Sequence, residues 1–332
     1  IFLTSSPLFD AAGVMLWTSL ILMALGSGVL QPALYAGAKE FSDPRTSAIS
    51  YSLIYAIMNL GIVIESFMSP YIRERGGMEA VFWTMAAVNV VALLALLLLF
   101  TRKVEKRDRV IDLDQEKQGQ QSLKQTLKSL PILDMRFMAF IFILLPVRTM
   151  FAHQWLTMPH YIMRCFPEAV GARYEWFQGL NPLIITFAVP LIAAMTRNVN
   201  VVWMMVVGTL VSALSTFILA PTPDLTLLVT YILVFSFGEA IWSSRFYEYI
   251  ADIAPLGRVG AYMGLAGIPW FLAKFLTGFY SGFMLEKFIP EQGVQDSGTL
   301  WVIYGVIALI SPLGLILMRN WMVKPLQQKQ EA

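Results

Sequence analysis

Apolar residues dominate long stretches of this chain, and short polar segments separate one stretch from the next. A helix needs roughly 20 predominantly apolar residues to cross a hydrocarbon core of about 30 Å. Nine runs are of about that length or longer: 12–37, 46–72, 79–101, 135–163, 175–196, 199–220, 225–253, 259–287 and 299–319. The pattern therefore predicts an all-α integral membrane protein with nine transmembrane helices.

The composition fits the same class. Hydrophobic residues make up 57% of the chain and charged residues 14%, whereas soluble domains contain about 45–50% and about 25%. The single cysteine, Cys165, excludes an internal disulfide and every motif that needs two thiols. A net charge of +2 gives no reason to expect a nucleic acid. The expected partners are the lipid bilayer and a small-molecule substrate, and the sequence identifies no protein partner.

Basic residues are distributed unequally between the two faces that the nine spans define. One face holds fifteen: Lys39, Arg45, Arg102, Lys103, Lys106, Arg107, Arg109, Lys117, Lys124, Lys128, Arg197, Arg258, Arg319, Lys324 and Lys329. The other holds five: Arg73, Arg75, Arg164, Arg173 and Lys287. Because basic loops stay in the cytoplasm, we expect the first face, with the C-terminus, to be cytoplasmic. Nothing in the sequence indicates which membrane is crossed.

A weak internal repeat indicates a unit of six spans. GSGVLQPALYAGAKEFSDPRTSAISY, from Gly26, aligns with FGEAIWSSRFYEYIADIAPLGRVGAY, from Phe237. Parallel six-span halves are the plan of the major facilitator transporters. The division expected from this plan is helices 4–6 of the first half in 1–101, a cytoplasmic linker in 102–134, helices 7–12 in 135–320 and a cytoplasmic tail in 321–332. Three helices of such a fold would precede residue 1.

The linker is charged and mostly lacks apolar periodicity. Leu123, Leu127 and Leu130 would form one apolar stripe of a short helix at the membrane surface. A solvated spacer is the alternative, and it is the more common arrangement for such a composition.

Several patches resemble the proton-coupled oligopeptide transporter family. They are GSGVLQP at 26–32, DPR at 43–45, SLIYAIMNLG at 52–61, FQGLNPLIITFAVPLIAA at 177–194, and FGEAIWSSR at 237–245 followed by IAPLGRVGAYMG. The resemblance runs in patches from about Gly26 to about Gly282. It implies a major facilitator fold that takes up di- or tripeptides together with protons.

The resemblance also implies site residues. The family's acid after a Gly in the tenth helix faces the central cavity and holds the amino terminus of a peptide, and Glu239 occupies that position. The Tyr-x-x-x-Asn pattern of the fifth helix falls on Tyr55 and Asn59, and the Asn before Pro in the eighth falls on Asn181. These residues are expected to line the cavity and to help bind the same amino group.

The chain departs from the family pattern at three places. Gln31 replaces the fourth-helix Lys that is implicated in binding the peptide carboxylate and in proton coupling. His153 stands beside Gln154 where the family has an acid beside Gln. The first-helix motif of acids and Arg would lie before residue 1.

Ionisable residues within the spans point to some of the same positions without the family. A charge at the bilayer centre costs at least about 2.5–3.5 kcal/mol, so such residues usually face a cavity or a partner. The spans contain Glu65, Arg148, His153, Glu239 and Lys274. Arg148, Glu239 and Lys274 lie near the middle of their spans, where the binding sites of transporters are found.

Each of these residues has an alternative role. Glu239 and Lys274 would lie on neighbouring helices and could form a buried ion pair that locks packing. Arg148 suits a substrate carboxylate, in place of the lost Lys, or an acid that precedes residue 1. Glu65 lies towards the outer end of its span, where it can snorkel. His153 is a natural proton switch, because its ordinary pKa is near neutrality, or else a neutral, hydrogen-bonded side chain.

Other residues bear on motion and gating. Arg245 and Glu248 are three residues apart, which predicts an intrahelical ion pair or a gate lock near the cytoplasmic end. Pro146 and Pro269 lie inside predicted spans, where they can act as kinks. Gly278 and Gly282 have the spacing that lets helices approach closely, as do Gly260 and Gly264.

The chain contains none of the P-loop, Gly-x-Ser-x-Gly and His-Glu-x-x-His motifs, so we expect no enzyme, no catalytic residue and no cofactor. No Cys or acid completes a metal site with His153 and His160. The sequence favours a secondary transporter that moves a small organic solute by alternating access, with a short peptide or an amino-acid-like zwitterion as substrate and protons as the candidate driving ion. The alternative is a transport-inactive major facilitator fold that serves as a structural or assembly subunit of a membrane complex.

Overall fold

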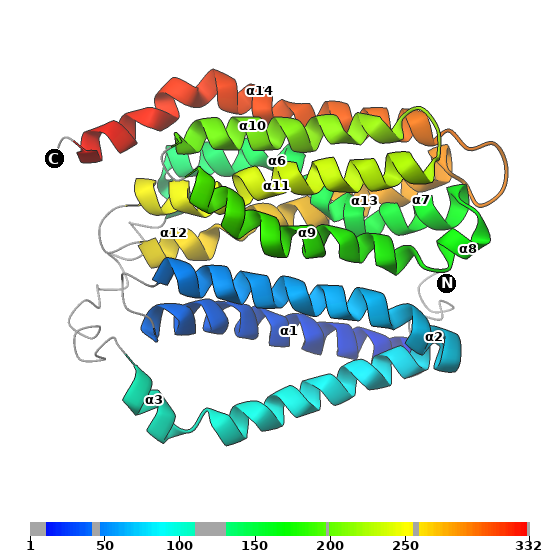
Figure 1. Ribbon diagram of the computed structural model, residues 1–332, viewed down its shortest axis with the longest axis horizontal. Coiled ribbons are helices and arrows are strands. Elements are labelled where there is room, and N and C mark those ends of the chain that lie inside the picture. The colour runs from blue at the N-terminus through cyan, green and yellow to red at the C-terminus, as the bar shows by residue number, and fades with distance from the viewer. Residues whose placement is uncertain (1–10, 42–46, 110–130, 197–198, 255–258, 331–332) are drawn as a thin grey trace. The chain divides into compact units, whose positions relative to one another are not determined.

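The computed structural model describes residues 11–41, 47–109, 131–196, 199–254 and 259–330 (Figure 1). Within these ranges the chain forms helices and no strands. The leucine stripe predicted at 123–130 lies outside the described residues. So do Pro44 and Pro255 of the internal repeat.

The chain divides into two compact units, Ile1–Tyr55 with Leu93–Gln120, and Ala56–Ala92 with Gln121–Ala332. In the first unit, α1 (Ala11–Glu40) contains the first predicted span. Phe41 and Phe100 meet edge to face, with their ring centroids 5.5 Å apart. The short helix α3 (Arg102–Asp108) follows, and Thr101 caps its first turn by accepting a hydrogen bond from Val104 N.

Helix α2 (Ser47–Leu99) contains the second and third predicted spans and is broken between them. The break lies at Gly76 (φ −141°, ψ 16°) and Gly77 (φ 67°, ψ −171°), where the chain turns back on itself (Figure 1). The torsion angles of Gly77 suit a residue without a Cβ. The turn between these two spans therefore depends on a glycine.

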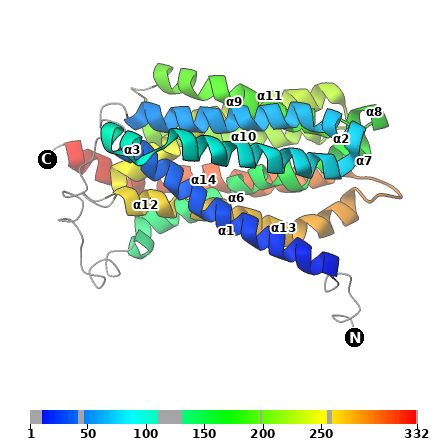
Figure 2. The same cartoon turned by 90° about the horizontal axis from the view of Figure 1, so that it is seen from below.

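The second unit contains a bundle of long helices joined by short elements (Figures 1 and 2). The long helices are α6 (Met135–Leu156), α9 (Tyr174–Met195), α10 (Val201–Ser215), α11 (Leu225–Ile253), α13 (Ile268–Phe288) and α14 (Ser297–Gln330). The short elements are η2 (Pro131–Leu133), α7 (Met158–Cys165), α8 (Glu168–Gly171), η3 (Thr216–Leu219) and α12 (Val259–Leu265).

Polar side chains fix where three of the long helices begin. Asp134 accepts hydrogen bonds from the backbone of Arg136 and Phe137 at the start of α6. Asn200 and Asp224 cap α10 and α11 in the same way. Such caps satisfy backbone N–H groups that have no partner within the helix.

Packing within the bundle is closest between α10 and α11. Helix α11 also packs on α9, while α6 packs on α13 and α14 and α10 packs on α14. A Cβ placed on Gly238 would lie 2.5 Å from Ser212 Oγ, and one on Gly208 would lie 2.7 Å from Trp242 Cβ. These two glycines bring α10 and α11 together, whereas a Cβ at Gly264, Gly278 or Gly282 would meet nothing within 4 Å.

Seven helices in the described residues are long and apolar enough to cross a membrane, judged by length and composition. One of the seven, Ala56–Leu99, covers parts of both predicted spans of α2, and the predicted span 259–287 is not among the seven. That span consists of α12 and α13, which are separate helices. The count of nine is therefore not confirmed.

Pro269 was expected to kink the interior of a span, and this expectation is wrong. It lies in the first turn of α13, just after Gly267. The first turn of a helix tolerates proline, because its N–H groups have no helical acceptor anyway. Pro146 does lie inside α6.

Candidate functional site

Glu239 and Asn181 meet between α11 and α9. The Asn181 side-chain amide, Nδ2, donates to Glu239 Oε2 at 2.9 Å and to Ser236 Oγ at 3.0 Å. Glu239 is only 6% exposed. Ser236 in turn donates to the carbonyl of Ile232, one turn back in α11, at 2.6 Å. An acid and an amide that were singled out separately in the sequence are therefore in direct contact.

Further polar groups link α6 to the same two helices. Gln154 Nε2 donates to Tyr231 Oη at 2.5 Å, and Gln178 Nε2 donates to the backbone carbonyl of Gln154 at 3.0 Å. The sequence had not singled out Ser236, Tyr231 or Gln178 as site residues. In the sequence, each of these residues is a polar side chain within an apolar run, and this pattern does not show which helices are in contact.

His153 is fully enclosed within the second unit. Its Nδ1 lies 2.8 Å from Thr157 Oγ1, and its Nε2 lies 2.9 Å from Tyr280 Oη. Tyr304 stacks on the ring, with centroids 3.6 Å apart. Both ring nitrogens therefore have hydroxyl partners, so a change of protonation on His153 would have to reorganise these hydrogen bonds.

Arg148 lies in an aromatic cage. Its guanidinium carbon is 4.3 Å from the ring centroid of Phe246, 5.1 Å from that of Trp242 and 5.5 Å from that of Trp270. The side chain is 3% exposed. The electron-rich faces of three aromatic rings stabilise its positive charge in this interior. The cage joins α6 to α11 and α13.

Lys274 does not form the buried ion pair with Glu239 that the sequence allowed. Lys274 is exposed, and its Nζ lies 5.2 Å from the ring centroid of Trp270. Within the described part of the chain it is in no salt bridge. Glu65 is also exposed, with Ser66 Oγ 3.5 Å from its carboxylate, while Asn59 is buried.

The side chains of Gln31 and Tyr55 lie outside the part of the chain that the structure describes. Both residues belong to the first unit, Gln31 in α1 and Tyr55 in α2. The expectation that they line the same cavity as Glu239 stays a prediction.

The predicted pair of Arg245 and Glu248 is present. Arg245 Nη1 lies 2.5 Å from Glu248 Oε2. Arg245 Nη2 also donates to the backbone carbonyl of Thr196 at 2.7 Å and to its hydroxyl at 2.9 Å. The arginine therefore joins α11 to the end of α9, in addition to its intrahelical partner.

A second arginine joins α2 to α9 near the turn at Gly76 and Gly77. Arg73 Nη2 lies 3.1 Å from Glu175 Oε1 and donates to the backbone carbonyl of Ala172 at 2.7 Å. In the sequence Arg73 counted only as an outer loop charge. Pairing between residues so far apart in sequence leaves no local pattern.

Among the described residues, no group of three or more His, Cys, Asp or Glu side chains is arranged to hold a metal ion. The polar groups that meet between α9 and α11 are an acid, an amide and a hydroxyl. Such a set can accept hydrogen bonds from an ammonium group and can orient it.

Comparison with known proteins supports the same class. Residues 1–164 match the family model of the Major Facilitator Superfamily, which is just under half of the 332 residues. A search of curated proteins found no match. The matched segment and the seven apolar helices together support an integral, multi-pass membrane transporter of the major facilitator type.

Proposed function

We propose that the protein is a secondary active transporter that moves an amino-acid-like zwitterion or a di- or tripeptide by alternating access. The observation that carries this proposal is the buried carboxylate of Glu239, held by Asn181 between α9 and α11. A carboxylate in a membrane interior usually faces a cavity or a partner. A substrate ammonium group would donate hydrogen bonds to the Glu239 carboxylate, alongside the Asn181 amide that already donates to it.

Arg148 is the proposed site for the opposite end of the substrate. Its charge lies at the junction of α6, α11 and α13, within the same unit as Glu239. Only 3% of the residue is exposed in this conformation. Contact with a substrate carboxylate therefore requires a rearrangement of Trp242 or Trp270, which fits a carrier that changes conformation in each cycle.

His153 is the proposed proton-coupling residue, with Glu65 and Lys274 as further candidates and with Arg245 and Glu248 as a cytoplasmic gate. Thr157 and Tyr280 bind the two ring nitrogens of His153. Adding a proton would make both nitrogens donors. Because at least one hydroxyl would then have to reorient, protonation there is coupled to the packing of α6 against α13.

The proposal is tested by reconstituting the full chain into liposomes. Uptake of a dipeptide and amino-acid mixture is measured with and without an inward proton gradient. We expect the proton gradient to drive uptake. Equal uptake with and without the gradient would refute the proposal that transport is coupled to protons. Absence of uptake for every solute would favour the structural or assembly subunit.

A variant of Glu239, with a matched control, distinguishes a role in substrate binding from a general loss of folded protein. Glu239→Gln keeps the shape and an acceptor for Asn181 but removes the charge. We expect uptake to fall by at least about tenfold, because a hydrogen bond to a charged group contributes about 1.5–3 kcal/mol. Glu168→Gln, an exposed position in α8, is the matched control and should transport normally. Normal uptake by Glu239→Gln would refute the assigned role.

A further inference from the structure

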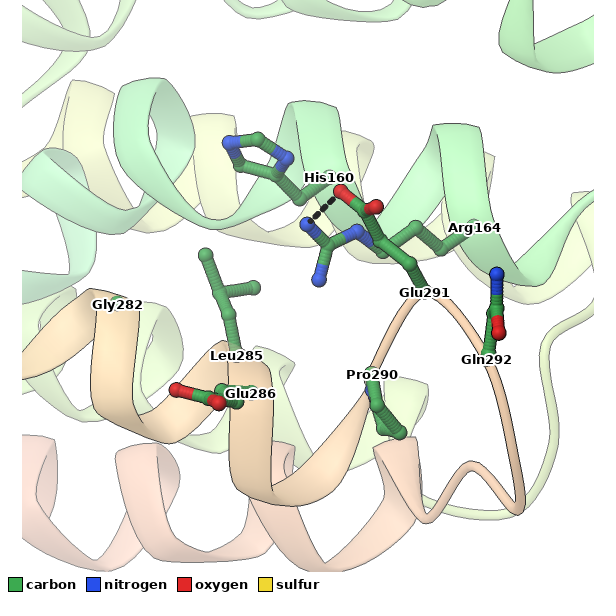
Figure 3. Close-up of a pocket in the computed structure, with 8 residues that line it drawn as sticks. All are labelled: His160, Arg164, Gly282, Leu285, Glu286, Pro290, Glu291 and Gln292. Atoms are coloured by element: carbon green, nitrogen blue, oxygen red, sulfur yellow. Dashed lines mark hydrogen bonds and ion pairs between the residues drawn. The ribbon is translucent and has the colours of Figure 1, made fainter.

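A pocket with charged side chains at its rim lies between α7, α13 and the loop that joins α13 to α14 (Figure 3). Its volume is about 550 Å³, within the range of about 300–1,000 Å³ that is usual for small-molecule sites. The residues that give it its chemistry are His160, Arg164, Gly282, Leu285, Glu286 and Glu291.

Arg164 has two contacts in this pocket, a hydrogen bond to the backbone and an ion pair with an exposed glutamate. Its Nη1 donates to the backbone carbonyl of Ile289 at 2.9 Å, and its Nη2 lies 3.0 Å from Glu291 Oε1. The side chain of Arg164 is 19% exposed, whereas that of Glu291 is 80% exposed. Exposed ion pairs contribute little stability. A ligand carboxylate can therefore take the place of Glu291 without disturbing the backbone contact that holds the arginine.

The pocket carries charges of both signs. Arg164 supplies one positive charge, and Glu286 and Glu291 supply negative ones (Figure 3). Burial and the nearby Arg164 lower the pKa of His160 below its ordinary value, so its ring is neutral near pH 7. A simple anion would meet two carboxylates here, and a simple cation would meet the arginine. A molecule with both charges satisfies both.

We infer that this pocket binds small zwitterionic amino compounds, with their carboxylate on Arg164 in exchange with Glu291 and their ammonium group towards Glu286. Leu285 supplies an apolar surface for the carbon skeleton. Gly282 leaves space for the ligand beside Leu285, since a Cβ at position 282 would meet nothing within 4 Å. Glu239 is not among the residues that line this pocket, and binding here does not require transport.

Binding is tested by calorimetry on the purified full chain in nanodiscs, in a Glu239→Gln background that removes the proposed central site. Alanine and glycylglycine are the probes, and acetate and ethylamine carry one charge each. We expect the zwitterions to bind and each single-charge probe to bind at least about tenfold more weakly, because each loses one charge-assisted contact.

Variants identify the pocket. Gly282→Phe fills it and should reduce zwitterion binding by at least about tenfold, while Gly278→Phe, one turn earlier on α13 and equally free of neighbours, should not change it. Arg164→Gln should abolish binding, and Glu291→Gln should strengthen it several-fold by removing the competing carboxylate.

Three results would overturn the inference. They are no zwitterion binding in the Glu239→Gln background, binding that is unchanged by Gly282→Phe, and acetate binding as tight as that of alanine. Because uptake is not measured, failure here leaves the transport proposal untouched. Loss of transport by Glu239→Gln likewise leaves this pocket untouched.

Discussion

Arg73 and Glu175, which are 102 residues apart in sequence, lie with Nη2 and Oε1 separated by 3.1 Å. The same arginine donates to the carbonyl of Ala172, and its guanidinium carbon lies 5.6 Å from the ring centroid of Tyr174. Three neighbouring groups, one just before α9 and two in its first turn, thus contact one side chain of α2. This arginine therefore connects α2 to α9 within the second unit.

Removing the ion pair between Arg73 and Glu175 should lower the stability of the protein. Arg73→Gln leaves the mostly buried carboxylate of Glu175 without its ion pair, which costs about 1–3 kcal/mol. We expect the apparent midpoint of thermal unfolding in detergent to fall by several degrees. Arg75→Gln, an exposed neighbour, should leave it unchanged, and the exchange Arg73→Glu with Glu175→Arg should recover part of the loss. Equal midpoints for Arg73→Gln and Arg75→Gln would contradict the ion pair's role.

The contact of α10 with α11 should tolerate no side chain at Gly238. Gly238→Ala places a methyl group 2.5 Å from Ser212 Oγ and 2.6 Å from Ser212 N, and such overpacking typically costs about 1–3 kcal/mol. Gly278→Ala meets no neighbour, so helix propensity should make it neutral or up to about 1 kcal/mol more stable. The midpoint of thermal unfolding should fall for Gly238→Ala and should stay the same or rise for Gly278→Ala. Equal changes of the midpoint in the two variants would mean that α10 and α11 can move apart at no cost in stability.

Asn181 should matter through its contact with Glu239. Asn181→Ala removes the amide that donates to the carboxylate at 2.9 Å, so substrate affinity should fall by about tenfold or more, since a charge-assisted hydrogen bond contributes about 1.5–3 kcal/mol. Thr186→Val, on the same helix, removes a hydroxyl that donates to the carbonyl of Pro182, within the same helix, and serves as the control. Concentration-dependent uptake gives the apparent affinity. Equal losses for both variants would show that α9 is merely sensitive to substitution.

His153 should determine the pH dependence of uptake. His153→Ala removes the ring that contacts both Thr157 and Tyr280, so we expect uptake by this variant to depend less on pH than uptake by the unchanged protein. His160→Ala is the comparison, because His160 lies outside the candidate spans. A profile that His153→Ala leaves unchanged while stability falls would assign the residue to packing alone.

Most of the helices, and two polar residues that prove to be in contact, were predictable from the sequence. Apolar length alone places most of the spans, and the family resemblance singled out Glu239 and Asn181, which are in contact. Tertiary pairing was not predictable. Periodicity shows which face of a helix is apolar but does not show which helix lies opposite, so the link from Arg73 to Glu175 and that from Gln154 to Tyr231 had no local signal.

The break between α12 and α13 was missed for a related reason. Hydropathy remains high across Ala266 and Gly267, so an apolar run continues where the helix stops. Pro269 was visible in the sequence, but a proline fits either a kink or a first turn. Only the torsion angles of neighbouring residues decide between them.

The turn at Gly76 and Gly77 has a consequence for biosynthesis. Gly76 and Gly77 alone leave helical geometry between the two apolar helices of α2. A connection this short ties the membrane insertion of the second helix to that of the first. If the turn faces the outside, as the distribution of basic residues predicts, the charged residues around it, Arg73, Glu74, Arg75 and Glu79, cross the bilayer in the same step.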